Sequence, residues 1–400
     1  MALEVPRTSR VFSELPPLSL YVHIPWCVRK CPYCDFNSHQ AIDVNEPHYI
    51  DCLLDDLDRD LHWVQERPLH SIFIGGGTPS LFSAESITRL IKGIQQRIAL
   101  EPSIEITLEA NPGTAEQARF YGYREGGVNR LSIGVQSFNT DHLQRLGRIH
   151  NGDNAKAAIQ LARDAGFENF NIDLMHGLPG QSLNHALDDL QTALQFQPPH
   201  LSWYQLTIEP NTVFYNAPPK LPEDDTLWDI QQAGIALLEQ YGMNHYEVSA
   251  YAKAGRRSRH NLNYWQFGDY LGIGAGAHGK ITVRDRGEIL RYRKTRLPRD
   301  YMAGIDPAKA SYLAATEAVP APELPFEFFM NALRLREGVP TKLFEQRTGL
   351  DLREIAPTLE KALALGLLES SPSQLAPTPQ GWLFLNDLTA LFLEQEHKLG

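Results

Sequence analysis

Six short apolar segments alternate with longer amphipathic segments over the first 240 residues, and this alternation limits the folds open to the chain. The apolar segments fit buried strands at residues 18–24, 71–74, 104–108, 130–135, 170–174 and 201–206. The amphipathic segments fit helices at residues 46–65, 84–99, 115–123, 155–164, 183–195 and 224–240. Strands that are apolar on both faces and are followed by helices are typical of a parallel sheet covered by helices. Six units are too few for a closed eight-stranded barrel, so the pattern predicts an α/β fold with an open, partial (β/α)6 barrel.

Chemically distinctive residues follow the first five of these strands. A loop with three cysteines follows the first strand, and a glycine run at residues 75–79 follows the second. The third strand ends at residues 109–112, the fourth ends at Gln136, and the fifth contains Asp173. Because functional residues of such sheets gather at the carboxyl ends of the strands, we expect these segments to line one cavity.

The chain is expected to divide into four regions. Residues 1–17 carry prolines and mixed charge and are expected to form a loose N-terminal arm before the barrel of residues 18–245. Residues 246–317 have a different pattern and are expected to form an extension. A segment rich in proline and alanine, residues 318–325, then begins a mainly α domain at residues 318–400. Three helices and a short ribbon give this last domain the pattern of a winged helix.

Composition and charge exclude several classes of partner. The chain has 37 basic and 48 acidic residues and a formal charge of −11, a field that repels nucleic acid and anionic lipid. No window reaches the roughly 18 apolar residues of a membrane span, and the N-terminus has no apolar signal core. Three clustered cysteines and one isolated cysteine do not form a disulfide framework, which favours a reducing compartment. We expect a cytoplasmic protein that binds no nucleic acid and whose membrane contact is at most peripheral.

Although the chain is acidic overall, residues 284–299 contain a cluster of basic side chains. Its members are Arg284, Arg286, Arg291, Arg293, Lys294, Arg296 and Arg299. A solvated face of a hairpin is the favoured interpretation. The alternative is a patch that binds the carboxylates of a ligand.

Cys27, Cys31 and Cys34 form a C-x3-C-x2-C cluster directly after the first strand. Thiolates are soft ligands that suit zinc or an iron–sulfur cluster, and three of them leave one position of a four-coordinate site open. Zinc is the simpler alternative, with His23 or His39 as the fourth ligand. The spacing between the first two cysteines is wider than in most zinc knuckles, so an iron–sulfur cluster is favoured.

The cysteine spacing, the aromatic residue before the last cysteine and the glycine run resemble the radical S-adenosylmethionine superfamily. The resemblance implies a 4Fe–4S cluster held by Cys27, Cys31 and Cys34, with S-adenosylmethionine bound to the fourth iron. It also implies that residues 75–79 form the loop whose backbone approaches the methionine amine.

Over essentially its whole length the chain is similar to the anaerobic coproporphyrinogen III oxidase family. The matching motifs are residues 21–34, 75–79, 108–112, 132–138 and 173–180. By this likeness the positions of the S-adenosylmethionine cavity are Tyr21, Tyr33, Gly76, Gly77, Thr78, Glu109, Gln136, Arg148 and Asp173. Glu109 and Asp173 can accept hydrogen bonds from the amine or the ribose, and Arg148 can pair with a carboxylate. Tyr33 can lie against the adenine.

Two features distinguish subfamilies. The oxidases carry a further cysteine two residues after the third, where this chain has Phe36, and they also carry a longer N-terminal segment. His260-Asn261-x-x-Tyr264-Trp265 resembles the motif of the HemW-type haem chaperones. The resemblance implies that His260 is an axial haem ligand and that Tyr264 and Trp265 contact the porphyrin. Without the motif, one histidine with two aromatic residues would more often be core packing.

The remaining histidines and the fourth cysteine receive no functional role. His142, His150, His176, His185 and His278 lack the spacing of a ligand set. Cys52 falls on the apolar side of a helix and is expected to be a small buried side chain.

These observations favour a haem chaperone that holds a 4Fe–4S cluster, S-adenosylmethionine and haem, and passes haem to an acceptor haem protein or respiratory enzyme. An electron donor such as a flavodoxin or ferredoxin is an expected partner. No catalytic residue is assigned, and the motifs favour a haem chaperone over an enzyme. The first alternative is an oxygen-independent coproporphyrinogen III oxidase, which decarboxylates its substrate to protoporphyrinogen IX. The second is a radical methyltransferase or other tailoring enzyme.

Overall fold

A computed structural model describes residues 10–113 and 119–393 of the chain. The first nine residues of the expected N-terminal arm and residues 115–118 of the helix expected at residues 115–123 lie outside the described residues. Residues 394–400 of the expected C-terminal domain also lie outside them.

A twelve-stranded sheet forms the framework of the molecule, with the order β14-β13-β12-β11-β1-β4-β5-β6-β7-β8-β10-β9. Six strands in its centre lie side by side in chain order, and every neighbouring pair is parallel. They are β1 (Leu18–Ile24), β4 (Leu69–Gly76), β5 (Leu100–Ala110), β6 (Arg130–Gln136), β7 (Phe170–His176) and β8 (His200–Gln205). The predicted α/β fold with a partial (β/α)6 barrel is therefore confirmed.

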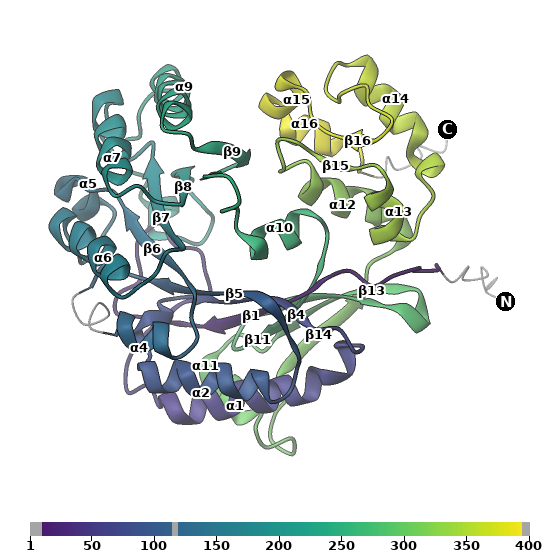
Figure 1. Ribbon diagram of the computed structural model, residues 1–400, viewed down its shortest axis with the longest axis horizontal. Coiled ribbons are helices and arrows are strands. Elements are labelled where there is room, and N and C mark those ends of the chain that lie inside the picture. Colours follow the sequence, from purple (N-terminus) through teal and green to yellow (C-terminus); the bar gives the residue numbers. More distant parts are fainter. Residues whose placement is uncertain (1–9, 114–118, 394–400) are drawn as a thin grey trace.

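Helices follow one another around the outside of the curved sheet, and the C-terminal elements lie across its open side (Figure 1). The outer helices are α1 (Glu46–Asp60), α2 (Ala84–Gln95), α4 (Phe120–Glu125), α5 (Thr140–Arg145), α6 (Gly152–Asp164), α7 (Leu183–Gln195) and α9 (Asp224–Gln240). Local sequence sets several of their starts. The side chains of Asn45, Ser83 and Ser182 each accept a backbone N–H of the first turn, as N-cap residues do. The helix expected at residues 84–99 ends at Gln95, since β5 begins at Leu100.

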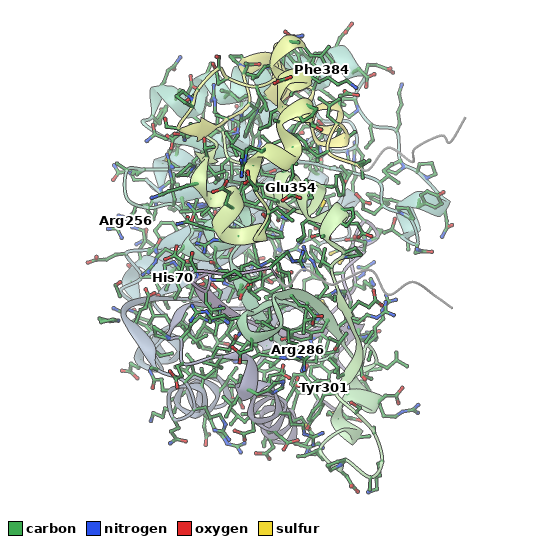
Figure 2. The ribbon with its side chains drawn as sticks, turned by 90° about the vertical axis from the view of Figure 1, so that its right-hand side faces the viewer. His70, Arg256, Arg286, Tyr301, Glu354 and Phe384 are labelled. Atoms are coloured by element: carbon green, nitrogen blue, oxygen red, sulfur yellow. The ribbon has the colours of Figure 1, made fainter. Side chains whose placement is uncertain are left out.

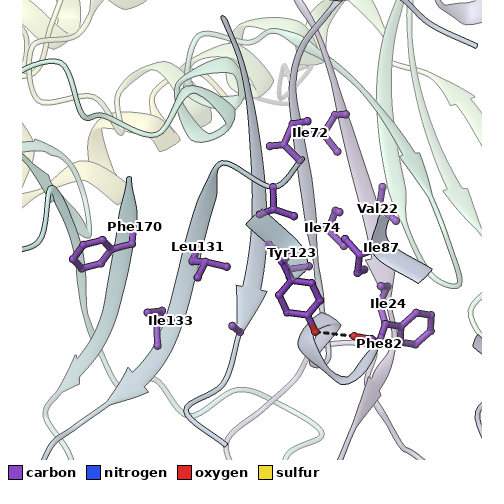
Figure 3. Packing of buried hydrophobic residues seen from close by; sticks show 14 of the residues in the cluster. Val22, Ile24, Ile72, Ile74, Phe82, Ile87, Tyr123, Leu131, Ile133 and Phe170 are labelled. Atoms are coloured by element: carbon purple, nitrogen blue, oxygen red, sulfur yellow. Dashed lines mark hydrogen bonds between the residues drawn. The ribbon is translucent and has the colours of Figure 1, made fainter. Parts of the chain in front are cut away.

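The core of the barrel lies between the sheet and this outer layer of helices (Figure 3). Strand β1 is buried on both faces, as a central parallel strand requires. Isoleucines of β4 and β6 pack in the same cluster as Ile87 of α2. The Tyr123 hydroxyl donates to the carbonyl oxygen of Phe82 at 2.7 Å, which satisfies a phenol within an apolar layer. Cys52 is fully buried in this core, as expected from its helix position.

The segment at residues 246–317 adds strands to both edges of the sheet. On the β8 edge, β9 (Asn244–Glu247) and β10 (Ala250–Ala252) are antiparallel. On the β1 edge, β11 (Asp269–Ile273) pairs in parallel with β1. The antiparallel strands β12 (His278–Val283), β13 (Glu288–Lys294) and β14 (Leu313–Ala318) follow it. The boundaries expected at residues 245 and 317 stay predictions.

Shorter elements complete this part. They are β2 (Trp26–Cys27), β3 (His39–Gln40), α8 (Val213–Asn216), α10 (Arg259–Trp265) and α11 (Pro298–Ala303). Helix α10 bears the predicted haem motif and lies between the barrel and the C-terminal elements (Figure 1).

The C-terminal part is mainly helical. It contains α12 (Leu324–Ala332), α13 (Lys342–Thr348), α14 (Ala356–Ala364), α15 (Pro379–Leu383), α16 (Leu385–Ala390) and a ribbon of β15 (Val339–Pro340) with β16 (Gln374–Leu375). Its own core includes a stacked pair, Phe329 and Phe392, whose ring centroids lie 3.7 Å apart. In Figure 2, Phe384 and Glu354 of this part lie in the upper half of the view and Tyr301 of α11 lies in the lower half. None of the helices in the described ranges is long and apolar enough to cross a bilayer.

Candidate functional site

A cavity of about 560 Å³ opens at the carboxyl ends of the barrel strands, and we call it the cluster cavity. It brings together most of the residues predicted for the cluster and for S-adenosylmethionine. The predicted residues that line it are Cys27, Cys31, Cys34, Tyr33, Gly76, Gly77, Thr78, Glu109, Gln136, Arg148, Asp173 and Trp265. The expected convergence of strand ends is therefore present.

The cysteine loop is closed at its base by a short parallel pair. Strand β2 ends at Cys27 and pairs with β3, so the loop leaves and rejoins the body of the protein at one point. All three cysteines are free thiols and line the cluster cavity. Arg148 Nη1 lies 3.7 Å from the Sγ atom of Cys31, where it can stabilise a thiolate. Burial raises the pKa values of Cys27 and Cys34, so binding a metal cluster would release protons from them.

The two histidines proposed to complete a zinc site have other partners. The ring nitrogens of His23 lie 2.8 Å from the Tyr21 hydroxyl and 2.9 Å from the Asn37 carbonyl oxygen. His39 Nε2 lies 3.2 Å from the Asn37 side chain. Within residues 10–113 and 119–393, no three His, Cys, Asp or Glu side chains are grouped to hold one metal ion.

The glycine run after β4 passes close to the chain that leads into the cysteine loop. Gly76 has a φ of +122°, and a β-carbon at this position would lie 2.7 Å from the His23 ring. A β-carbon at Gly77 would lie 2.6 Å from the Trp26 carbonyl oxygen. Only glycine fits these two close approaches without displacing a neighbour. The backbone is thereby exposed to the cavity with no side chain in front of it.

Two partly buried carboxyl groups face the cluster cavity. Glu109 Oε2 accepts the backbone N–H of Gly76 at 2.9 Å, and burial raises the pKa of Glu109 to about 8. Asp173 accepts hydrogen bonds from Ser132 at 2.9 Å and from Asn171 at 2.7 Å. Burial also raises the pKa of Asp173. A cationic ligand placed between these groups would favour their ionised forms.

Arg148 and Gln136 are fixed by hydrogen bonds from neighbouring strands. Arg148 Nη2 donates to Asn111 Oδ1 and to the carbonyl oxygen of Gly134, both at 2.7 Å. Gln136 has a left-handed backbone, with a φ of 69°, and its Oε1 accepts from the Tyr204 hydroxyl at 2.8 Å. This strained position at the end of β6 turns the side chain into the cavity.

Several residues of the cavity were not identified from sequence. They include Ser132, Asn171, Ser202, Tyr204, Glu247 and Arg334. Ser202 and Tyr204 alternate along β8 and pair in register with Asp173 and Met175, so they share the face of Asp173. Period-two alternation was thus a usable signal for them. Arg334 comes from the C-terminal part, and no local sequence signal places it here.

Helix α10 packs on the sheet through the histidine of its motif. His260 is 1% exposed, and its ring nitrogens lie 2.9 Å from the Ser71 hydroxyl and 2.9 Å from the Tyr264 hydroxyl. Glu105 accepts the backbone N–H groups of Arg259 and His260 at the start of the helix. Burial lowers the pKa of His260 to about 3, so its imidazole is neutral. In this conformation neither ring nitrogen of His260 is free to bind iron.

The two aromatic residues of the motif share a small cavity of about 130 Å³ but line different large ones. Trp265 lines the cluster cavity, and Arg334 lies over its ring at 4.4 Å from the centroid. The indole N–H of Trp265 is buried and has no hydrogen-bond partner among the described residues. Tyr264 instead lines a second cavity of about 560 Å³. Tyr21, predicted for the S-adenosylmethionine site, also lines this second cavity and not the cluster cavity.

The fold and the cysteine loop define a radical S-adenosylmethionine protein. The model of the Radical SAM superfamily matches residues 21–193, and that of the HemN C-terminal domain matches residues 319–384. Among solved structures, coproporphyrinogen III oxidase (HemN) from Escherichia coli superposes with a TM-score of 0.77 at 24% identity, over 94% of this chain and 90% of that one. This likeness shows the fold.

Relatives of higher identity show the family. "Heme chaperone HemW" from Haemophilus influenzae is 56% identical over 388 residues, which cover 96% of this chain and all of the relative. The proteins of the same name from Escherichia coli and Bacillus subtilis are 54% and 36% identical, over 96% and 94% of this chain and 100% and 99% of theirs. The chain belongs to the HemW family, as the sequence motifs predicted.

Proposed function

We propose that the protein is a haem chaperone: it holds a 4Fe–4S cluster, binds S-adenosylmethionine and haem, and transfers haem to an acceptor haem protein. The name shared by its relatives supports haem as the cargo. The observation that carries the proposal is the convergence of three free thiols and the strand-end polar groups on the cluster cavity.

The donor set fits the proposed cluster. Cys27, Cys31 and Cys34 are soft ligands on one loop, and all three face one cavity. When bound, a 4Fe–4S cluster with S-adenosylmethionine supplies one-electron chemistry. The protein's own contribution is to hold the thiols on a loop closed by β2 and β3, and to place Arg148 beside Cys31.

The polar groups of the cluster cavity suit the proposed second ligand. Glu109 and Asp173 would accept hydrogen bonds from its amine and ribose hydroxyls, and Arg148 would pair with its carboxylate. Tyr33 would lie against the adenine, and the backbone at Gly76 and Gly77 would approach the methionine portion.

The motif on α10 supports a contact with haem through aromatic faces. Trp265 offers an unpaired N–H and a ring at the cluster cavity, and Tyr264 offers a ring at the second cavity. Axial ligation by His260 stays a prediction, and it requires His260 to leave Ser71 or Tyr264. The hydrogen bond between His260 Nε2 and the Tyr264 hydroxyl supports a positioning role for this histidine.

The proposed partners are an acceptor haem protein or respiratory enzyme and, for the cluster, a reductant such as a flavodoxin or ferredoxin. A cytoplasmic location is part of the proposal.

Anaerobic assays separate this function from the oxidase alternative. The cluster-reconstituted protein is loaded with haem and mixed with apomyoglobin, and transfer is followed as the appearance of the holomyoglobin Soret band. The same preparation is incubated with coproporphyrinogen III, S-adenosylmethionine and a reductant. We expect haem transfer and no protoporphyrinogen at enzymatic rates. Rapid decarboxylation without haem binding would overturn the chaperone proposal.

A further inference from the structure

The cluster cavity continues past the residues proposed to hold the cluster and S-adenosylmethionine. Gln136 ends β6 and lines the cavity, and Arg130, which begins the same strand, lines it as well. The lining therefore extends from the carboxyl end of the strand to its amino end. We call the part near the amino ends of the strands the inner lobe. Its lining residues include Arg130, Asn171, His200, Asn261, Trp265 and Arg334.

Three side chains of the inner lobe carry a buried N–H group that has no acceptor. These groups are Arg130 Nε, Trp265 Nε1 and Arg334 Nε, and none has a hydrogen-bond partner within residues 10–113 and 119–393. Arg130 as a whole is only 2% exposed. Buried donors without an acceptor are rare and unfavourable. Three of them on one cavity indicate a ligand that supplies acceptor atoms.

Arg130 has only long contacts with other side chains. Its Nε lies 4.0 Å from Glu105 Oε2, and its Nη1 lies 3.5 Å from Thr107 Oγ1. Glu105 is held elsewhere, since its Oε1 accepts the backbone N–H groups of Arg259 at 3.0 Å and of His260 at 3.2 Å. The Arg130 guanidinium is therefore a buried cation that is incompletely paired.

The histidines around Arg130 add no second charge. Burial, and then the charge of Arg130, lower the pKa values of His200 and His260. Both imidazoles are therefore neutral at neutral pH. The field of Arg130 in this part of the cavity thus favours an anionic group.

Arg334 brings a second guanidinium into the inner lobe from the C-terminal part. It lies over the ring of Trp265, 4.4 Å from the centroid. Burial lowers the pKa of Arg334, and the neighbouring Glu247 acts in the opposite direction. Burial also raises the pKa of Glu247 to about 7, so this carboxyl group neutralises Arg334 only in part at neutral pH. An incoming carboxylate would stabilise the Arg334 guanidinium further.

We propose that the inner lobe binds the two propionate groups of haem, one at Arg130 and one at Arg334, with the Trp265 ring against the porphyrin. The inference rests on the proposed haem-handling function and names the residues that would receive the cargo. Two separate cations beside an aromatic ring match two carboxylates on a flat macrocycle. The propionates would also supply the acceptors that the two arginine Nε atoms lack.

A porphyrin and its ester together test the carboxylate contacts. Cluster-reconstituted protein is titrated anaerobically with iron-free protoporphyrin IX and with its dimethyl ester, and both titrations are followed by fluorescence. The ester keeps the ring but has no charged carboxylate. We expect the wild-type protein to bind the free acid about tenfold or more tightly than the ester, since the ester forms no charge-assisted hydrogen bonds.

The variants Arg130→Gln and Arg334→Gln assign this preference to residues, with Arg336→Gln as the matched control. The Arg336 side chain is 48% exposed, lies two residues from Arg334 and does not line the cluster cavity. Each of the first two variants should bind the free acid several-fold more weakly and the ester almost unchanged. The control should keep the wild-type preference. A purely structural role would lower both affinities alike, and Arg334→Lys, which keeps the charge, should restore part of the preference.

Cluster absorbance and the affinity for S-adenosylmethionine show whether each variant is intact. If Arg130→Gln does not assemble the cluster, Arg334→Gln decides the result, because Arg334 is only partly buried. An undiminished preference for the free acid in Arg334→Gln would overturn the inference. Loss of S-adenosylmethionine binding with an unchanged porphyrin preference would also overturn it, because the arginines would then serve the other ligand.

Two results in the wild-type protein separate this inference from the function on which it rests. Haem binding and transfer without any preference for the free acid would overturn the inference and leave the chaperone proposal intact. If the wild-type protein binds neither haem nor protoporphyrin, the proposed function fails and this inference fails with it.

Discussion

The cluster cavity and the second cavity have similar volumes but are lined by different kinds of side chain. The cluster cavity lies at the ends of parallel strands and is lined by partly buried carboxyl, amide and hydroxyl groups, several of which are joined by hydrogen bonds. The second cavity lies at the added β1 edge and is lined by aromatic rings and exposed arginines. The first is therefore a polar space whose groups are held in place by their neighbours. The second is a space with aromatic walls and positive charge at its rim.

Two histidines close to these cavities also differ. His260 belongs to a recognisable motif, yet it lines neither cavity and is buried with both ring nitrogens engaged. His278 received no functional role from the sequence, yet it lines the second cavity and is exposed. A motif therefore marks a region of importance, while burial decides which side chains a ligand can reach.

The largest effect is expected at the cysteine loop. Changing Cys27, Cys31 or Cys34 to Ser should abolish the visible absorbance of the reconstituted cluster, since a serine oxygen is a poor ligand for iron in place of a thiolate. Iron and sulfide analysis after anaerobic reconstitution measures the loss. Cys52→Ala is the matched control and should retain full cluster, because Cys52 lies in the core of the barrel. A serine variant with normal iron and sulfide would remove that cysteine from the ligand set.

The wall of the second cavity depends on the buried group around Lys294. Lys294→Met leaves Asp56 and Asp60 buried without their cation, and the free energy of unfolding should fall by about 3–5 kcal/mol. Arg299→Met, at an exposed position of the same basic cluster, should change it by less than about 0.5 kcal/mol. Urea denaturation of both variants measures the difference. Equal free energies of unfolding for the two variants would show that Lys294 does not stabilise the wall of the second cavity.

Binding of S-adenosylmethionine should depend on pH through Glu109, which lines both cavities. Glu109 has its pKa raised to about 8 by burial, so the ligand-free protein holds it protonated at neutral pH. A cationic ligand favours the ionised form, and the affinity for S-adenosylmethionine should therefore rise with pH up to about 8 and then level off. Calorimetric titration from roughly two pH units below that value to about one unit above it measures this dependence. Glu109→Gln should bind more weakly and without this slope, while the exposed Glu85→Gln should behave as wild type.

The smallest effect is expected for Tyr264→Phe, which removes one hydrogen bond to His260. The free energy of unfolding should fall by about 1 kcal/mol. If His260 only positions Tyr264, the haem spectrum and the haem affinity should change little. Tighter binding in this variant, through the freed His260 nitrogen, would show that His260 can bind the iron.

Local pattern was enough to predict the barrel but not what covers its edges. The first strand matches its predicted bounds, Leu18–Ile24, because a central strand is apolar on both faces. The glycine run and the strand-end carboxyl groups were found because their place follows from the βα order. The pairing of β11 with β1 had no such signal, since nothing local links residues so far apart. The placement of Tyr21 and His278 in one cavity depends on that pairing.

The hydrogen bonds of His260 show a second limit of prediction from sequence, which is how a helix docks on a strand. Its spacing of four residues from Tyr264 on a helix makes contact between the two side chains predictable. Its contact with Ser71 depends on how α10 docks on β4, which sequence pattern does not specify. The sequence motif therefore predicts His260 as an iron ligand but does not show that Ser71 bonds to its Nδ1 atom.

The parallel pairing of β1 with β11 also has a consequence for synthesis. Val22 pairs with Ile273, which the ribosome adds on the order of tens of seconds later. Until then the strand that leads into the cysteine loop lies at an unfinished sheet edge, a place where nascent chains associate wrongly. The loop gains this neighbour only after residues 269–273 have been made, so iron and sulfide delivered before that point would meet an incomplete binding site.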